Sequence, residues 1–326
     1  MLLAGDVGGT KTRLGIFETA DPRPRAIAIR TYLTTEFDSF TAILDAFERE
    51  VNLTFTVDAA AAGVAGPVIG DTARLTNIAW DVSASEIASR FGTTRVALLN
   101  DLVAMAASAD VLTMDELVVL QNGRPQADGN GAVIAAGTGL GVACLVRIDR
   151  RLRPVPSEGG HADFAPRTDR EIDLLRMLRT MYGRASVEDV LSGPGLLNLH
   201  RFTHEGRECA AIRGLDDRDA PAGVSQAALA GTCESCREAL EMFVSAYGAE
   251  AGNLALRGLA TAGVFVGGGI APKILPALRD GRFMEAFRSK GPMSDLAAMI
   301  PVKVMVHAEA GLLGAAVCAQ EMFSRP

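Results

Sequence analysis

Six residues near the start of the chain combine an acidic side chain with a glycine pair between two apolar runs: Gly5, Asp6, Val7, Gly8, Gly9 and Thr10. Glycine permits positive φ angles and leaves backbone amides unobstructed, so successive N–H groups can converge on an anion. The stretch fails the Walker A pattern, because Thr10 stands where that pattern needs glycine. Residues 13–17 then alternate with the period of a strand. We therefore predict a strand–turn–strand hairpin that binds phosphate, with Lys11 adding a cation.

Two further glycine clusters follow apolar runs. Gly137, Thr138 and Gly139 separate the runs 132–136 and 140–146, which predicts a second hairpin of the same kind. Two such hairpins suggest a duplicated architecture with one hairpin per domain, the two facing each other across a cleft. The third cluster is Gly267, Gly268 and Gly269, between a predicted strand at 264–266 and a helical pattern at 273–278. Bare glycine backbone there can lie against a flat ring or a ribose, so the three clusters together indicate a nucleotide.

Asn100 and Asp101 follow a predicted strand at 95–99 and precede a predicted helix at 102–108. Ligands of α/β sheets collect at the carboxyl ends of strands, where these two side chains are expected. Asp101 is also a good residue to cap the helix that follows. The two roles are compatible, and Asp101 remains a candidate for both.

A glycine-flexed loop at 156–164 carries Glu158 and His161, polar residues suited to recognising a polyol. Residues 186–189 read as a capping box that starts a short helix, which ends at 192–195. Glu188 lies in that box. It is a second candidate for binding hydroxyl groups, although it could merely complement the helix dipole.

The five cysteines, at positions 144, 209, 233, 236 and 318, are odd in number and scattered, as expected of reduced cytosolic thiols. Cys233 and Cys236 form one C-x₂-C pair, which supplies only half of a zinc site. His200 and His204 lack the order of a zinc-protease motif, and we predict that they lie on the surface. The sequence therefore favours structural thiols at Cys233 and Cys236.

Bulk composition narrows the class of protein. The chain has 326 residues, enough for two domains, and its 48% hydrophobic content supports a sizeable core. The net charge of −7 argues against nucleic acid or an anionic membrane as partner. The longest uncharged stretch, 131–146, is shorter than the roughly 20 residues of a membrane span, and the first residues show no signal peptide. Predicted strands alternate with helices, the first helix at 40–51 and an early strand at 59–64, which indicates an α/β protein.

Taken together, the motifs resemble bacterial glucokinase. They keep their order over nearly the whole chain, at 5–10, 75–80, 99–102, 136–141, 157–161, 191–195, 267–270 and 309–314. The resemblance implies an α/β, two-domain actin-like (ribonuclease H-like) ATPase fold with a central cleft. It implies a small domain of residues 1–111 plus 309–326, with a C-terminal helix at about 310–323, and a large domain of residues 112–308.

The resemblance also implies an activity, the ATP-dependent phosphorylation of the 6-hydroxyl of glucose, a step of glycolysis. Asp101 would be the general base, and the hydroxyl groups of glucose would be bound by Asn100, Asp101, Glu158, His161 and Glu188. ATP phosphates would lie on the Gly5–Thr10 and Gly137–Gly139 turns, with Asp6 orienting magnesium indirectly and Gly267–Gly269 against the adenosine. A cytoplasmic homodimer is expected. Lys11 departs from relatives that have asparagine there, and the cysteine-rich motif of zinc-containing sugar kinases is missing.

Three alternatives remain open. A kinase of the same fold could act on another hexose, an amino sugar or a small carboxylate, but a carboxylate would call for a nearby arginine. A sugar-sensing regulator would need a DNA-binding module, and the first hairpin begins four residues after Met1. A filament or chaperone ATPase would not need the residues that read hydroxyl groups.

Overall fold

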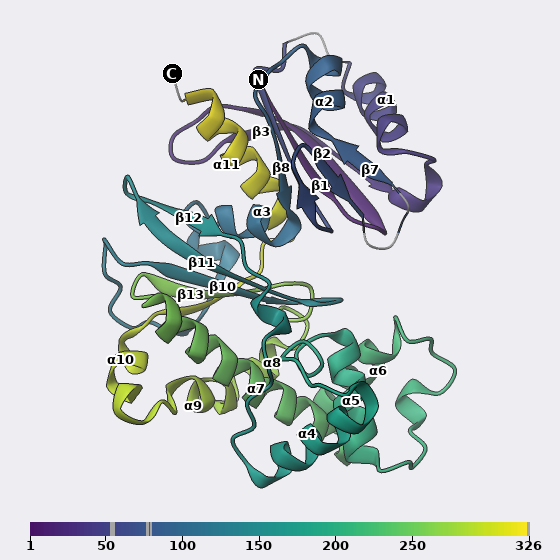
Figure 1. Cartoon of the computed structure of the whole chain (residues 1–326), viewed down its shortest axis with the longest axis vertical. Helices are drawn as coiled ribbons and strands as arrows, with labels where there is room; N and C mark the ends of the chain where they lie inside the picture. Colours follow the sequence, from purple (N-terminus) through teal and green to yellow (C-terminus); the bar gives the residue numbers. More distant parts are fainter. Residues whose placement is uncertain (53–55, 76–77, 79, 325–326) are drawn as a thin grey trace. The chain divides into compact units, whose positions relative to one another are not determined.

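The computed structural model describes residues 1–52, 56–75, 78 and 80–324 (Figure 1). Its internal contacts divide the chain into two compact units, which are described separately. Unit 1 comprises Met1–Thr113, Arg151–Pro156 and His307–Pro326, and unit 2 comprises Met114–Arg150 and Ser157–Val306. Three residues of the 75–80 motif, Thr76, Asn77 and Ala79, lie outside the described residues.

Unit 1 contains a five-stranded sheet in the order β3-β2-β1-β4-β8 and a small sheet in the order β5-β6-β7. Strands β1, β2 and β3 are antiparallel neighbours, whereas β4 runs parallel to β1 and β8 runs parallel to β4. The strands are β1 (Leu2–Val7), β2 (Lys11–Glu18), β3 (Arg25–Leu33), β4 (Ala59–Val64), β5 (Val68–Ile69), β6 (Thr72–Arg74), β7 (Asp81–Ser83) and β8 (Val96–Asn100).

Helices cover both faces of the larger sheet of unit 1. They are η1 (Thr34–Glu36), α1 (Phe40–Val51), α2 (Ala84–Phe91), α3 (Asp101–Ala107) and α11 (Ala310–Ser324), and strand β12 (Arg151–Val155) is grouped with this unit. In Figure 1 the C-terminal helix α11 lies along the sheet strands of unit 1. The predicted helix at 40–51 is confirmed, and the predicted C-terminal helix is confirmed within one residue of its end.

Strand β1 shows why both faces are covered. Leu2 and Ala4 belong to the apolar cluster that includes Leu312 of α11, whereas Leu3 and Val7 belong to the cluster that includes Phe47 of α1. Successive strand residues point to opposite faces, so β1 places apolar side chains on both. Its polar residue near the carboxyl end, Asp6, is consequently an exception in an otherwise buried strand.

Unit 2 is built on a sheet in which β11, β10, β13, β14 and β9 lie in that order. Strands β10 and β11 form an antiparallel hairpin, β13 and β14 continue in parallel, and β9 closes the edge antiparallel to β14. The strands are β9 (Leu117–Gln121), β10 (Gly131–Ala136), β11 (Leu140–Ile148), β13 (Gly263–Gly267) and β14 (Val302–Met305).

The helices of unit 2 surround α7, which packs against strands β10, β11 and β13. They are η2 (Met114–Glu116), η3 (Gly159–His161), α4 (Asp169–Tyr182), α5 (Gly193–His204), η4 (Ala210–Ile212), α6 (Ala220–Leu229), α7 (Glu234–Gly258), α8 (Leu275–Leu278), α9 (Arg282–Arg288), η5 (Gly291–Met293) and α10 (Ser294–Met299). One large apolar cluster joins the sheet to these helices and includes Phe243, Phe283 and Phe287, all fully buried.

The two units share a strand order. The series β2-β1-β4-β8 in unit 1 and the series β11-β10-β13-β14 in unit 2 each consist of an antiparallel hairpin followed by two parallel strands. Both predicted hairpins exist, at β1–β2 and β10–β11, and each unit holds one. The prediction of a duplicated architecture, made from two glycine turns, is confirmed at the level of topology.

Several local predictions were wrong. Residues 186–189 form a turn rather than a helix: the Asp189 carboxylate accepts hydrogen bonds from the backbone N–H and the hydroxyl of Ser186, and helix α5 begins only at Gly193. The helical pattern at 273–278 yields only the one-turn helix α8. The histidines His200 and His204 were predicted on the surface, but their exposed fractions are 6% and 4%, because α5 turns that face toward α7.

No helix in the described part of the chain has both the length and the apolar character needed to cross a membrane.

Candidate active site

Asp6 lies near the end of β1, where three elements of unit 1 meet. Arg13 of the neighbouring strand donates a hydrogen bond from Nη1 to Asp6 Oδ2 at 3.3 Å. The first turn of α11 lies against the same carboxylate, since a Cβ atom added to Gly311 would be 3.2 Å from Asp6 Cγ. Burial raises the pKa of the Asp6 carboxyl, Arg13 partly offsets the rise, and Glu309 adds to it. Asp6 is thus a half-buried carboxylate with one arginine partner, in surroundings that favour a further positive charge.

Asn100 and Asp101 lie at the junction of β8 and α3, as predicted. Asn100 rather than Asp101 is the N-cap: its Oδ1 accepts a hydrogen bond from Leu102 N at 3.0 Å. Asp101 is the first helical residue, and its Oδ1 accepts from the same N–H at 2.8 Å. The Asp101 side chain is exposed, yet the surrounding protein atoms raise its pKa by desolvation, and the Asp6 carboxylate raises it further. Unit 1 therefore places two mutually repelling carboxylates at one end of its parallel strands.

Gly63 allows this junction to form. It pairs with Asp6 on one side and with Leu99 on the other. A Cβ atom at Gly63 would lie 2.5 Å from Ala104 Cβ and 3.6 Å from Asp101 Cα, so a larger residue would push α3 away from β4. The strand predicted at 59–64 includes Gly63, but no local sequence pattern reveals this requirement.

The first hairpin turn is held by its own backbone and by a threonine. Gly8 N donates to Lys11 O at 3.1 Å, and Thr34 Oγ1 donates to Gly8 O at 2.7 Å. The freedom of glycine to adopt positive φ angles is not used in this turn or in the second one, because Gly8, Gly9, Gly137 and Gly139 all have other φ angles. What glycine supplies here is bare backbone rather than left-handed geometry.

The second hairpin turn, in unit 2, is closed by a bond from Gly137 N to Gly139 O at 2.8 Å. The N-terminus of α5 is fastened to it, because Gly193 N donates to Gly137 O at 2.8 Å. Ser192 caps α5 by accepting from Gly195 N. The partial positive charge of a helix N-terminus is thereby held beside the turn, which suits an anion. A Cβ atom at Gly137 would meet nothing within 4 Å, so its backbone is open to a ligand.

Glu188 joins this turn to the predicted sugar loop. Its Oε2 accepts from Leu140 N at 2.7 Å, and the same oxygen would lie 2.6 Å from a Cβ atom at Gly139. Its other oxygen, Oε1, lies 3.9 Å from His161 Nδ1, and its backbone N donates to Gly160 O at 2.9 Å. The structure therefore brings Glu188 and His161 together beside the second hairpin turn.

Glu158 belongs to the same loop through its backbone. His161 N donates to Glu158 O at 3.0 Å in the single turn η3, and both side chains are exposed. Arg184 steadies the loop by donating to His161 O. Of the three predicted sugar residues in unit 2, His161 and Glu188 are thus neighbours by their side chains, and Glu158 joins them through the turn.

The third glycine cluster packs against the base of the second hairpin. Gly268 has φ of +85°, and a Cβ atom there would lie 2.3 Å from Ala136 O, so this position requires glycine. Ile270 N donates to the same oxygen at 3.2 Å. A Cβ atom at Gly269 would meet nothing within 4 Å, which leaves open backbone for a ligand. The clusters at 137–139 and 267–269 are therefore neighbours.

Tyr247 of α7 links these two segments through its side-chain hydroxyl, a role that sequence reasoning missed. Its hydroxyl accepts from Ala136 N at 3.1 Å and lies 3.2 Å from Gly267 O, to which it can donate. The side chain is fully buried, and burial raises the pKa of Tyr247. No sequence pattern marks a lone tyrosine within an apolar helix as a partner for two strand ends.

Replacing Tyr247 by Phe should lower the free energy of unfolding by about 1–3 kcal/mol, because a buried backbone N–H and C=O lose their partner. Urea unfolding measures the change. Tyr182→Phe is a matched control, since its hydroxyl donates to Asn198 Oδ1 from a half-exposed side chain. Equal losses in the two variants would contradict the fastening role of Tyr247.

The two units repeat one strand order, each with a glycine hairpin turn, and unit 1 has carboxylates at the ends of its parallel strands. These features fit a protein of the actin-like ATPase class, in which such turns and carboxylates suit phosphoryl transfer. Comparison with known proteins agrees. A family model described as glucokinase matches residues 3–322. The glucokinase of Synechocystis is 40% identical over 346 residues, covering 98% of each chain.

Solved structures give the same result. A glucokinase from an Antarctic psychrotroph superposes with a TM-score of 0.88 at 32% identity, covering 98% of both chains. A ROK-family glucokinase from Streptomyces griseus, in complex with glucose and AMPPNP, has a TM-score of 0.64 at 22% identity, covers 98% of this chain and 99% of its own, and supports the fold alone. The chain belongs to the glucokinase family, and it is a kinase. The resemblance drawn from the motifs and the predicted fold class are both confirmed.

Proposed function

We propose that this kinase transfers the γ-phosphoryl group of ATP to the 6-hydroxyl of glucose, with Asp101 as the general base. Membership of the glucokinase family supports the reaction. The observation that supports Asp101 as the base is its exposed carboxylate, which accepts a hydrogen bond from Leu102 N at the start of α3. Desolvation and the charge of Asp6 both raise its pKa. A base whose pKa is raised toward the working pH accepts a proton more effectively than an ordinary carboxylate.

In this mechanism Asp101 accepts the proton of the sugar hydroxyl while the hydroxyl oxygen attacks the γ-phosphorus. Asn100 and Asp101 of unit 1, and Glu158, His161 and Glu188 of unit 2, bind the remaining hydroxyl groups. Phosphoryl transfer depends mainly on positioning and on stabilising charge, so these contacts matter more than any covalent step by the protein.

The nucleotide is proposed to lie on the glycine turns. The phosphates would lie against the turn at Gly8–Thr10 and the turn at Gly137–Gly139, and the adenosine against Gly267–Gly269, where the backbone of Gly269 is open. The helix N-terminus fastened to Gly137 adds favourable potential for an anion. An ATP analogue bound to the Streptomyces griseus relative is consistent with a nucleotide in this fold.

Asp6 is proposed to orient magnesium through its water shell. Its half-buried carboxylate, with Arg13 at 3.3 Å and a raised pKa, fits a site that a divalent cation would complete. Bound magnesium would neutralise charge on the ATP phosphates. The expected cytoplasmic location and homodimer stay predictions.

The acid limb of the kcat/KM profile should fall at higher pH than an ordinary aspartate, of pKa near 3.8, would give. The sign follows because Asp101 must be deprotonated to act, and desolvation by the surrounding protein atoms together with the charge of Asp6 raises its pKa. The profile is measured with saturating magnesium and ATP, with circular dichroism at each pH to exclude unfolding. A limb at or below the ordinary value would contradict the assignment.

The proposed function is tested with an assay that couples ADP release to a visible signal, run across glucose, mannose, fructose, galactose and glucosamine. Glucose should give the highest kcat/KM. A higher kcat/KM for another hexose or for glucosamine would show that this sugar, and not glucose, is the substrate, and it would leave the fold and the role of Asp101 unaffected. If no sugar gives ADP release, the proposal is wrong.

A further inference from the structure

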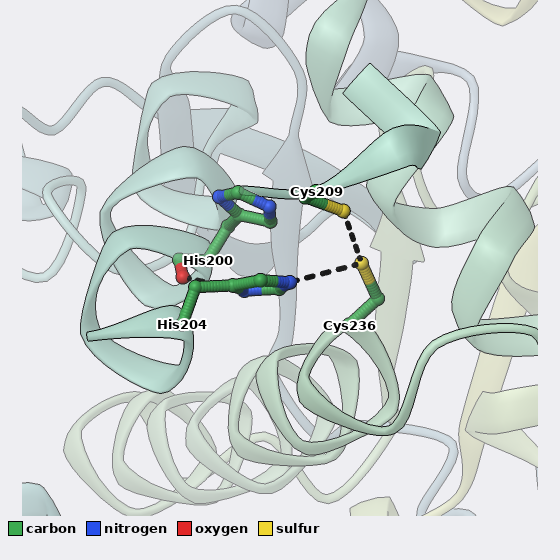
Figure 2. Close-up of side chains that lie close together, drawn as sticks. All are labelled: His200, His204, Cys209 and Cys236. Carbon is green, nitrogen blue, oxygen red and sulfur yellow. Dashed lines mark hydrogen bonds between the residues drawn. The ribbon is translucent and has the colours of Figure 1, made fainter. Parts of the chain in front are cut away.

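A cluster of histidine and cysteine side chains lies in unit 2, where the end of α5 meets the start of α7. His200 and His204 lie one turn apart at the C-terminal end of α5, Cys209 follows in the loop, and Cys236 lies in the first turn of α7. One ligand atom of each lies within 4.8 Å of the others. Figure 2 shows the two imidazole rings one above the other, with their edges turned toward the two thiols. Segments far apart in the sequence thus converge on one point.

The distances within the cluster match a tetrahedral zinc site. Cys209 Sγ lies 3.6 Å from Cys236 Sγ, and His204 Nε2 lies 3.9 Å from Cys236 Sγ and 3.4 Å from Cys233 Sγ. Zinc bonds of about 2.3 Å to sulfur and about 2.0–2.1 Å to nitrogen, at tetrahedral angles, place ligand atoms about 3.5–3.8 Å apart. The side chains therefore need little movement to bind one ion.

His204 is already oriented as a ligand. Its Nδ1 lies 2.9 Å from the backbone oxygen of His200, to which it can donate a hydrogen bond. That bond leaves Nε2 unprotonated, with its lone pair directed at the sulfur atoms. Histidines that bind metal commonly donate their other ring N–H to a carbonyl or carboxylate, which fixes the ring in this way.

His200 supplies an independent sign of a missing group. Its ring stacks on that of His204 with centroids 3.8 Å apart, and its exposed fraction is 6%. Its Nε2 atom is buried without a hydrogen-bond partner among the described residues. A buried polar atom of this kind is costly, and an ordered water beside the cluster would relieve it.

The cluster is accessible from outside. A cavity of about 460 Å³ is lined by His204, Cys209, Cys233 and their neighbours, which provides an entry path. If His204, Cys209, Cys233 and Cys236 bind one ion, the protein supplies all four ligands. No coordination position is then left open, as in structural rather than catalytic zinc sites. The site lies in unit 2 at the opposite end of α5 from Gly193, the residue that contacts the second hairpin turn.

We infer that His204, Cys209, Cys233 and Cys236 bind one structural zinc ion, which fastens the segment between α5 and α7. Each thiol that binds releases its proton to solvent, so the ion is held by three thiolates and one neutral imidazole. His200 packs against this site without binding in it. The inference does not depend on the proposed function.

Metal analysis of the full-length protein, purified under reducing conditions with any histidine tag removed, tests the site. After dialysis against a weak chelator, we expect about one zinc ion per chain in the wild type and below about 0.1 in Cys209→Ser. The matched control is Cys144→Ser, a half-buried thiol of β11 outside the cluster, which should keep its zinc. A strong chelator should lower the melting temperature of the wild type and of Cys144→Ser, but not that of Cys209→Ser.

A cobalt titration tests the same site without relying on a variant that might not fold. Cobalt added to the reduced, metal-free wild type should give thiolate-to-cobalt charge-transfer absorption and the visible bands of a tetrahedral ion, saturating at one equivalent. Failure to bind either ion, or zinc retained at full stoichiometry in Cys209→Ser, would overturn the inference. So would a disulfide between Cys209 and Cys236 in protein that carries no zinc, which would make the cluster a redox pair.

Discussion

Asp101→Asn is expected to lower kcat by about 10²–10⁴, the usual contribution of a general base. The amide keeps the shape of the side chain, and its oxygen can still accept from Leu102 N, the bond that Asp101 Oδ1 makes at 2.8 Å. The helix start therefore survives, and only the ability to accept a proton is lost. The rate should be measured at saturating glucose and ATP, with the binding of glucose measured separately by calorimetry.

The control for this variant is Asp115→Asn, an exposed carboxylate on η2, which should leave kcat unchanged. The melting temperature of Asp101→Asn should remain close to that of the wild type, because Asn100 supplies the principal cap of α3. Turnover within tenfold of the wild type would show that Asp101 serves only the helix start, and the base would have to be sought elsewhere.

The parts of this protein that were predictable from sequence are those in which neighbouring residues determine the outcome. The hairpins at β1–β2 and β10–β11 were predicted from a glycine turn between two apolar runs, and both are present. Asn100 and Asp101 were located for the same reason, because a buried strand followed at once by a helix leaves polar residues at the junction. The order of the motifs then identified the family.

The parts that were missed depend on contacts between distant segments. His204 and Cys236 are 32 residues apart, and no recognised spacing links His204 to the C-x₂-C pair, so that pair was taken as only half of a zinc site. Tyr247 contacts Ala136 across 111 residues. The turn at 186–189 was mistaken for a helix because Ser186 and Asp189 form the local hydrogen bond of a capping box. In the structure Glu188 N donates to the backbone oxygen of Gly160, a residue of a distant loop, and no helix continues from this turn.

Glu188→Gln is expected to weaken glucose binding by about 10- to 100-fold, the range that follows from losing a hydrogen bond to a charged group. The substitution keeps an oxygen able to accept from Leu140 N, the bond that Glu188 makes at 2.7 Å, so the hairpin turn stays anchored. The negative charge beside His161 is removed. Isothermal calorimetry with glucose alone measures the change in affinity.

The contact with Leu140 also gives Glu188 a second possible task, and the kinetic constants separate the two. If Glu188 reads sugar hydroxyls, Glu188→Gln should raise the KM for glucose and leave the KM for ATP nearly unchanged. If it only holds the turn, Glu188→Gln should behave like the wild type and Glu188→Ala should raise the KM for ATP, because Leu140 N then loses its acceptor. Glu158→Ala, in the loop of His161 and without that bond, is the matched comparison and should affect glucose alone. Glucose affinity unchanged in both Glu188 variants would remove Glu188 from the sugar site.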